Sequence, residues 1–307
     1  MTLLHPGPVS TPRQRPATAA SPFLKWAGGK TQLLPQLLPR LPGGQTGLPA
    51  RFERYFEPFL GSAALFFALQ PTRAVLSDAN PRLMAVYQAL QRDPEPVIAA
   101  LARFRNERDC YYEARGWRHD ELPQAQAAAR IIFLNKTCYN GLYRENRRGE
   151  FNVPFGRYKN PRICDAANLR AVHRALEGVV LRCQDFAEAL DDTLPGDFVY
   201  LDPPYHPLSA TASFTGYHRD GFGVEEQRRL AAAVRELDRR GVRFMLSNSD
   251  TPLIRELYAG YPACRVEARR AINSKAERRG KVAELIVRNY GEQAPVTVVM
   301  GAVADGG

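Results

Sequence analysis

Short apolar runs alternate with longer amphipathic stretches along most of the chain. The short runs are rich in Val, Leu, Phe and Tyr, as buried strands are, and the longer stretches repeat apolar residues at helical spacing. The predicted strands are Arg54–Phe59, Ala74–Ser77, Val179–Cys183, Asp197–Leu201, Val242–Ser247, Cys264–Ala268 and Glu284–Asn289. The predicted helices are Ser62–Gln70, Pro81–Leu90 and Val224–Arg240. This order predicts an α/β fold built on an open sheet.

The alternation stops between Val86 and Asp165, where the sequence becomes polar, helical and aromatic. Roughly 80 residues are too many for a connection inside a compact sheet, so this interval predicts an inserted domain. The N-terminal residues are rich in Pro, Ser, Thr and Ala, which predicts disorder, and the C-terminal end is interpreted in the same way. The expected parts are a disordered tail (1–20), the first part of the core (21–85), the inserted domain (86–165), the second part of the core (166–292) and a flexible tail (293–307).

The 307 residues carry a formal net charge of +10, and the whole excess falls in two short stretches. Lys136–Arg162 contains seven basic and two acidic residues, and Arg265–Lys281 contains the same numbers. Positive charge concentrated in this way favours a site for a polyanion. The alternative is two solvated loops whose charges have no partner.

Composition also excludes several classes of protein. No segment approaches the roughly 18 consecutive apolar residues of a membrane helix, and the first residues lack the apolar stretch of a signal peptide. We therefore expect a cytoplasmic protein without a membrane partner. The five cysteines and five histidines are scattered, without the spacing of a disulfide framework or a zinc site. Metal catalysis is therefore not expected.

A glycine and an acid mark the ends of the first two predicted strands. Gly61 follows Tyr55–Phe59, where a glycine lets a ligand approach the backbone of an open α/β sheet. Asp78 ends the next strand, where a carboxylate can accept hydrogen bonds from ribose hydroxyls. Asp78 could instead, or in addition, cap the helix that begins at Pro81.

The segment Asp202-Pro-Pro-Tyr205 follows an apolar strand and is a specific signal. Two prolines fix the backbone and remove two N–H donors, which leaves the Asp202 carboxylate and nearby carbonyls as a rigid set of acceptors. Such a set suits a ligand with two N–H groups, for example an exocyclic amine. Tyr205 offers an aromatic face to the same planar group.

Gly29-Lys30-Thr31 resembles part of a phosphate-binding loop, but that loop needs a glycine where Leu24 stands, and no strand precedes it. A nucleotide triphosphatase is therefore improbable. Trp26 instead offers a plane for stacking, and Lys25 and Lys30 offer donors.

The segment Asn135–Lys159 interleaves Arg and Lys with Tyr, Phe, Asn and Gly. Arg can read guanine with two hydrogen bonds, Asn can read adenine, and Tyr can stack among bases. Arg147–Glu150 has the composition of a β-hairpin turn, a shape that can enter a major groove. An Arg-rich surface hairpin would explain the charge but not the aromatic residues.

Together these segments resemble the Dam-type DNA adenine-N6 methyltransferases, and the match runs from Phe23 to about Tyr290. The resemblance implies a Rossmann-like mixed sheet of the methyltransferase type, S-adenosylmethionine as methyl donor and an inserted target-recognition domain. The matching segments are Phe23–Lys30, Glu57–Gly61, Ser77–Asn80, Tyr139–Arg144, Gly149–Gly156, Asp202–Tyr205 with Pro207–Thr211, and Leu246–Ser249. The chain departs from the family at Ala63, where a second glycine is common.

The resemblance also implies roles for individual residues. The catalytic set is Asp202, Pro203, Pro204 and Tyr205, and the cofactor set is Trp26, Lys30, Phe59, Gly61, Asp78 and Asp202. The set expected at the DNA bases is Lys25, Tyr139, Asn140, Leu142, Arg144 and Pro154, with Arg144 as the guanine reader. Asn273, Ser274, Arg278 and Arg279, in the second basic stretch, are assigned to phosphate contacts.

The expected activity is methylation of the N6 amino group of a flipped-out adenine in double-stranded DNA, within GATC, by a monomer that needs no metal. A cognate restriction endonuclease is compatible with this expectation but is not indicated by the sequence. Three alternatives stay open: an RNA methyltransferase, a cytosine-N4 methyltransferase, and a DNA-binding protein that keeps the fold without catalysis.

Overall fold

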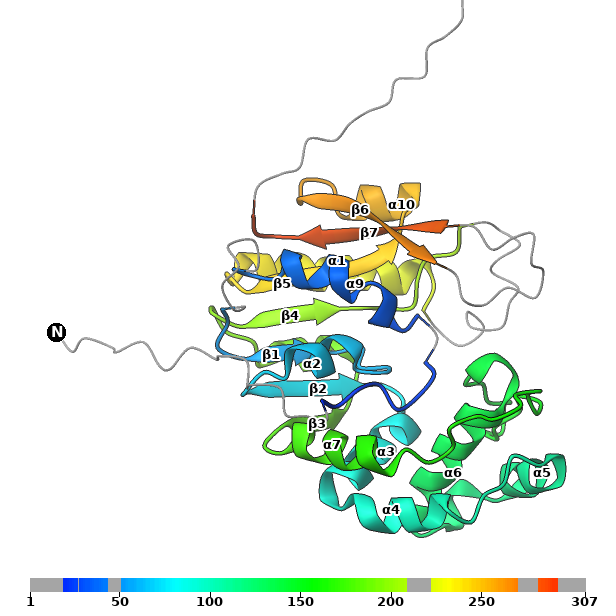
Figure 1. Cartoon of the computed structure of the whole chain (residues 1–307). Helices are drawn as coiled ribbons and strands as arrows, with labels where there is room; N and C mark the ends of the chain where they lie inside the picture. The colour runs from blue at the N-terminus through cyan, green and yellow to red at the C-terminus, as the bar shows by residue number, and fades with distance from the viewer. Residues whose placement is uncertain (1–18, 27, 44–50, 209–221, 270–280, 292–307) are drawn as a thin grey trace, which may run out of the picture.

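A computed structural model of the chain describes residues 19–26, 28–43, 51–208, 222–269 and 281–291 (Figure 1). Its centre is a seven-stranded sheet in the order β3-β2-β1-β4-β5-β7-β6. The strands are β1 (Tyr55–Glu57), β2 (Ala74–Asp78), β3 (Val180–Cys183), β4 (Phe198–Leu201), β5 (Arg243–Ser249), β6 (Ala263–Arg269) and β7 (Lys281–Arg288). Each strand predicted from the sequence is confirmed, with ends that differ by a few residues.

Strand direction places the loops that matter for function. The five strands β1 to β5 run parallel, whereas β7 is antiparallel to both β5 and β6. The predicted mixed sheet is therefore confirmed. Because parallel strands end at the same edge, the segments that follow β1, β2, β3 and β4 meet there, which is where open α/β sheets bind ligands.

Successive residues of the strands face opposite sides of the sheet and enter two separate cores. In β4, Phe198 and Tyr200 join one apolar cluster, while Val199 and Leu201 join the other. All four are buried, so β4 is covered on both faces, as its uninterrupted apolar run indicates.

Helices cover both faces of the sheet (Figure 1). One face carries α1 (Leu34–Leu37), α2 (Ala64–Leu69), α3 (Pro81–Arg92) and α7 (Ala166–Leu176), and the other carries α8 (Phe186–Asp191), α9 (Val224–Arg239) and α10 (Pro252–Leu257). The three helices predicted from the sequence are confirmed. One of them, α2, begins at Ala64 instead of Ser62 because Gly61 and Ala63 both adopt positive φ angles.

Beyond the β3 edge lies a helical region made of α4 (Pro94–Leu101), α5 (Arg108–Gly116) and α6 (Gln124–Thr137) (Figure 1). The buried Arg130 of α6 donates to the carbonyl oxygens of Ala114 and Arg115, at the end of α5, and so joins these two helices. The boundary predicted at Val86 lies inside α3, which runs through it without a break.

Of the predicted N-terminal tail, Ala19 is exposed and Ala20 is buried against the core, while residues 1–18 lie outside the described residues, as does 293–307. Within the part of the chain that the structure describes, no helix is long and apolar enough to cross a membrane.

Candidate active site

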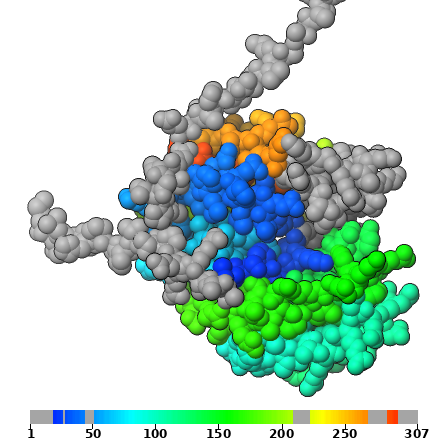
Figure 2. Space-filling model, viewed as in Figure 1, coloured from blue at the N-terminus to red at the C-terminus, as the bar shows by residue number. Residues whose placement is uncertain are grey.

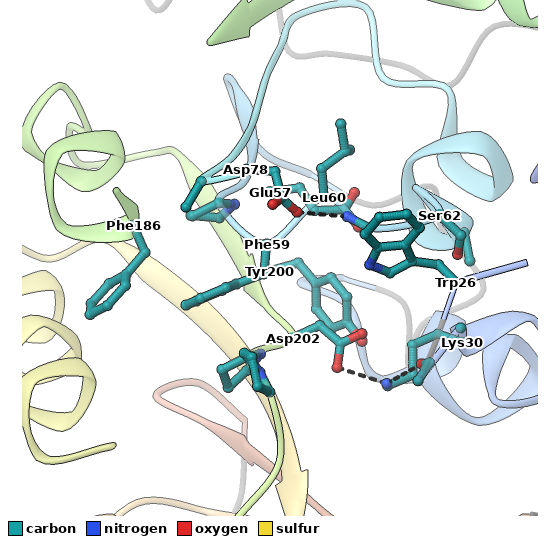
Figure 3. A pocket seen from close by; sticks show the side chains of 18 of the residues that line it. Trp26, Lys30, Glu57, Phe59, Leu60, Ser62, Asp78, Phe186, Tyr200 and Asp202 are labelled. Carbon is teal, nitrogen blue, oxygen red and sulfur yellow. Dashed lines mark hydrogen bonds and ion pairs between the residues drawn. The ribbon is translucent and has the colours of Figure 1, made fainter. Parts of the chain in front are cut away.

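A cavity of about 480 Å³ opens at the carboxyl ends of the central strands (Figure 3). Its walls come from the β1–α2 loop, the end of β2, the start of α8, the turn after β4 and the N-terminal segment that includes Trp26 and Lys30. This volume lies in the range of small-molecule and cofactor sites. The structure therefore brings the three separate motifs of the sequence to one pocket.

The β1–α2 loop is shaped around Trp26. Gly61 has φ = +47°, and a Cβ atom added there would lie 2.9 Å from Cδ1 of Trp26. Tyr87 of α3 fixes the same glycine by donating its hydroxyl to the Gly61 carbonyl at 2.9 Å. Glycine is therefore favoured at position 61 by its backbone angles and by the lack of space beside Trp26.

Ala63 occupies the position where the resemblance predicted a glycine, and its backbone is left-handed (φ = 54°, ψ = 35°). A residue with a Cβ atom costs roughly 1–2 kcal/mol in that conformation, whereas a glycine adopts it freely. The Ala63 N–H donates to the Leu60 carbonyl at 2.7 Å, so the turn forms despite this strain.

Asp78 lies at the end of β2 and points toward the cavity (Figure 3). Its carboxylate accepts the backbone N–H groups of Gly61 (3.1 Å) and Asn80 (3.0 Å), and burial raises its pKa above the ordinary value. The interpretation of Asp78 as a helix cap was wrong. Asn80 is the N-cap of α3, because its side chain accepts from the backbone N–H groups of Arg82 and Leu83.

Aromatic side chains line one part of the cavity. Phe59, predicted from the sequence, stacks on Phe186 of α8 with ring centroids 5.3 Å apart, and meets Phe222 edge to face at 5.6 Å. All three contact the cavity and offer an apolar surface to a planar ring. Phe186 and Phe222 carried no signal in the sequence, because nothing local distinguishes them from core residues.

Lys30 and Asp202 form an ion pair of 2.7 Å inside the pocket (Figure 3). Lys30 is buried, also donates to the Gly28 carbonyl at 2.5 Å, and lies 4.7 Å from the ring centre of Tyr205. Burial raises the pKa of Asp202 to about 6, the charge of Lys30 opposes that rise, and the charge of Glu284 adds to it. Lys30, predicted at the cofactor, thus also contacts Asp202, which the sequence predicts to be catalytic.

Glu57 is a buried acid in the same cavity that the sequence analysis did not single out as a site residue. Only 3% of it is exposed, and it accepts the Tyr55 hydroxyl at 2.8 Å. Burial raises its pKa to about 8, so the carboxyl group is protonated at neutral pH. The available signals were its place directly before Pro58, at the end of a buried strand, and the resemblance of the segment Glu57–Gly61 to the family.

This pKa predicts a pH-dependent stability. Between pH 4.5 and about 8 the folded chain keeps a proton on Glu57 that the unfolded chain releases, so rising pH favours unfolding in that window. Glu57→Gln cannot titrate and can still accept from Tyr55. Its Tm should therefore exceed that of the parent chain by several degrees at pH 8 and hardly at pH 5, since 1 kcal/mol corresponds to about 2 °C in a large domain. Calorimetry at both pH values without ligand checks this, and an equal Tm difference at the two would contradict it.

Tyr205 is held from outside its own motif. Its hydroxyl donates to the carboxylate of Glu284 on β7 at 2.6 Å. The antiparallel strand β7 therefore fixes the far end of the ring that the sequence predicts as the aromatic face of the site. Glu284 was missed because it follows Tyr205 by many residues and lies in an ordinary strand pattern.

The predicted base-contacting residues lie together on the helical region. Tyr139 and Asn140 form a short turn (η5, Tyr139–Gly141) after α6, and the Tyr139 N–H donates to the Pro154 carbonyl at 2.9 Å. Tyr139 is 45% exposed, which is unusual for a large aromatic residue. Leu142 follows the turn and is partly buried. Backbone hydrogen bonds of Tyr139 with Pro154 and Leu142 thus hold these four residues close together.

A hairpin continues from these residues. Asn146 accepts the Gly149 N–H and donates its own N–H to the Glu150 carbonyl, which confirms the turn predicted there. Its arms pair only through isolated bridges, one of them between Glu145 and Phe151. Arg144 is exposed at the base of the hairpin, and its Nε donates to the side chain of Asn152 at 2.6 Å. Asn152 therefore orients the guanidinium group.

Lys25 and Trp26 lie between the turn and hairpin that follow α6 and the cavity. The buried side chain of Asn135 accepts the Lys25 N–H and donates to the Lys25 carbonyl, both at 2.7 Å, and Lys25 Nζ lies 3.6 Å above the Tyr158 ring. The next residue, Trp26, lines the cavity and packs against Tyr143 at 5.1 Å. Figure 2 shows this first described segment, in dark blue, next to the green part of the chain.

The structure describes only part of the second basic stretch, Arg265–Lys281. Arg265 is exposed and pairs with Asp250 at 3.1 Å. Asn273, Ser274, Arg278 and Arg279, assigned to phosphate contacts, lie outside the described residues. Among the residues that are described, no three His, Cys, Asp or Glu side chains are grouped to hold a metal ion.

Known proteins are similar to this chain over the segments that line the cavity. The family model described as D12 class N6 adenine-specific DNA methyltransferase matches residues 26–272, which include every segment that lines the cavity. The Type II methyltransferase M1.LlaDCHI of Lactococcus lactis subsp. cremoris is 41% identical over 278 residues, 88% of this chain and 95% of the relative. M.MjaIII of Methanocaldococcus jannaschii is 42% identical over 288 residues, covering 88% and 99%. The DNA adenine methylase of Escherichia coli K12 is 38% identical over 268 residues, covering 86% and 93%.

Proposed function

The chain belongs to the D12 class of N6-adenine-specific DNA methyltransferases, and on that premise we propose that it methylates adenine within GATC in duplex DNA, with S-adenosylmethionine as donor. The observation that carries the proposal is the meeting of Asp202-Pro-Pro-Tyr205 with the cavity at the carboxyl ends of the strands. The choice of GATC rests on the resemblance of the Tyr139–Pro154 segment to the Dam type.

The cavity fits S-adenosylmethionine in its chemistry as well as in its size. Asp78 offers a carboxylate at the end of β2 for ribose hydroxyls, and the Phe59 and Phe186 rings offer an apolar surface for a purine. Lys30 and Asp202 are charged groups of opposite sign at the other side of the cavity, suited to an amino acid end. The bound cofactor supplies a methyl group on a sulfonium, which is already a good leaving group.

The residues after β4 prepare the accepting nitrogen. We assign the Asp202 carboxylate and the Pro203 carbonyl to accept the two N–H groups of the adenine amine, with the ring lying on Tyr205. These two hydrogen bonds disfavour delocalisation of the nitrogen lone pair into the ring and direct it toward the cofactor side of the cavity. Alignment of this kind accounts for most of the catalysis.

Access to the amine requires that adenine leave the base stack. Tyr139, which is half exposed, and Arg144, which Asn152 orients, are the residues we assign to contact the bases around the vacated position. Lys25 lies between this surface and the cavity, so it can contact either the recognised bases or the extruded one.

One experiment separates the proposed function from its rivals. Methyl incorporation from labelled S-adenosylmethionine should occur in duplex oligonucleotides with GATC and drop at least tenfold when any one base pair of the site is changed. Sequencing of modified bases in DNA from cells that express the chain then identifies the product. N4-methylcytosine, or incorporation only into ribosomal RNA, would replace the proposal, and no incorporation at all would indicate a non-catalytic DNA-binding protein.

The pKa of Asp202 predicts the acidic limit of the reaction. Because the carboxylate must be ionised to accept the amine, kcat should fall as pH drops through about 6. Glu284→Gln keeps an acceptor for Tyr205 but removes the charge that raises this pKa, so the acidic limb should move to lower pH. Asp202 is also faced by Lys30, Tyr205 and Glu57. The acidic limb of Glu284→Gln is therefore compared with that of Glu57→Gln. An unchanged limb in Glu284→Gln would show that another group sets it.

A further inference from the structure

Three buried polar side chains surround the turn after β4. Gln227 lies in the first turn of α9, and Asn248 and Ser249 are at the end of β5. Gln227 and Asn248 have no solvent exposure, and Ser249 has 3%. Polar groups are costly to bury, so such a cluster needs partners, and its partners here are backbone atoms of the turn.

Each of the three groups holds a different part of the turn. Gln227 Nε2 donates to the Pro204 carbonyl at 2.8 Å. Asn248 Oδ1 accepts the His206 N–H at 3.2 Å, and Ser249 Oγ donates to the His206 carbonyl at 2.6 Å. Two prolines leave the turn with few backbone donors, so the backbone is held through the Pro204 and His206 carbonyls and the His206 N–H. The Pro203 carbonyl takes part in none of these three contacts.

The orientation of the two amides is fixed by the network itself. Asn248 Oδ1 must be the acceptor because two backbone N–H groups, of His206 and Ser249, point at it. Its Nδ2 then donates to Gln227 Oε1 at 3.0 Å, which leaves the Nε2 of Gln227 to face Pro204. A change in either amide therefore alters the contact at Pro204.

We propose that Gln227, Asn248 and Ser249 are positioning residues that fix the Pro204–His206 backbone and thereby aim the Pro203 carbonyl at the target amine. This inference rests on the proposed methyl transfer. A misplacement of about 1 Å can cost on the order of 100-fold in rate when a reaction depends on alignment. The proposal gives a role to the segment Leu246–Ser249, one of those that carry the family resemblance.

Gln227→Leu and Gln227→Glu test the proposal together, with kinetics on the GATC duplex. Leu has no donor for Pro204, so kcat should fall about 10- to 100-fold while KM for cofactor and for DNA changes less than about threefold. Glu can donate to Pro204 only when protonated. The ratio of its kcat to that of the parent chain should therefore be near 1 at pH 6 and decline toward the value for Gln227→Leu as pH rises to 9.

A matched control and a second readout complete the test. Gln91→Leu removes an amide that also donates to two carbonyls, those of Leu176 and Val179, at the opposite end of the sheet, and should leave kcat within about twofold. Without ligands, amide hydrogen exchange at His206 should be faster in Gln227→Leu and unchanged in Gln91→Leu.

The results distinguish this inference from the proposed function. Absence of methyl transfer in the parent chain would count against the proposed function alone, and exchange at His206 would still report on the turn. A folded Gln227→Leu with parental kcat and parental exchange at His206 would overturn the inference. So would a kcat ratio for Gln227→Glu that stays near 1 from pH 6 to pH 9, because an ionised carboxylate cannot donate to the Pro204 carbonyl.

Discussion

Replacement of Asp202 by alanine is expected to abolish methyl transfer, with kcat reduced about 1,000-fold or more, while cofactor and DNA still bind. The carboxylate is the charged acceptor of the amine, and loss of a single preorganised polar group at a reaction centre costs about 100- to 1,000-fold in known enzymes. Loss of the charge also removes the partner of Lys30 at 2.7 Å. Single-turnover rates with labelled cofactor measure the first effect, and titration calorimetry measures binding.

Two further variants separate the chemical role of Asp202 from its structural one. Asp202→Asn keeps the shape and one acceptor, so its residual rate should exceed that of Asp202→Ala. Asp202→Ala and Asp202→Asn both leave the buried Lys30 without its counter-ion, which destabilises the fold. The double variant Lys30→Met/Asp202→Asn removes that charge and should recover thermal stability without recovering rate. Near-parental turnover in Asp202→Ala would refute the assignment.

Arg144→Ala is expected to relax discrimination at one guanine of the recognition site. A bidentate contact between Arg and guanine is worth about 1–3 kcal/mol, so the preference for that base should fall about 5- to 150-fold. Asn152→Ala should cause a smaller loss at the same base, because it frees the guanidinium group without removing it. Methylation rates on the single-base variants of GATC measure both effects.

The control for Arg144 is Arg147, which lies exposed in the hairpin turn. A contact with phosphate alone carries no sequence information, so Arg147→Ala should weaken all duplexes about equally and reduce the dependence of binding on salt. Unchanged base preference in Arg144→Ala, or a base-specific loss in Arg147→Ala, would transfer the reading role to another residue.

Much of the fold was predictable because strand patterns and strand ends are local properties. Apolar runs predicted the seven strands. One site residue lies at or after the end of each of three strands: Gly61 after β1, Asp78 at the end of β2 and Asp202 after β4. Since parallel strands end at one edge, the convergence of these three residues follows from the α/β pattern. The Arg147–Glu150 hairpin turn could also be predicted, because its own residues favour a turn.

Other parts of the site depend on contacts between distant residues and could not be predicted. Glu284 reaches Tyr205 only because β7 inserts next to β5, antiparallel to it. Gln227 looks like any polar residue in the first turn of an amphipathic helix. The sequence left open whether Asp78 caps α3, because Asp78 and Asn80 are both good capping residues two positions apart, and only the backbone decides between them.

The continuity of α3 limits how this protein could be redesigned. The helix packs against β2 and β3 on one side and against α6 on the other, so a single rigid rod passes from the sheet to the helices that carry the hairpin. One residue added to or removed from its middle would rotate everything downstream by roughly 100°. Recognition regions exchanged between relatives should therefore keep activity only when the graft preserves the helical phase of α3, so chimeras ought to be joined at whole turns of that helix.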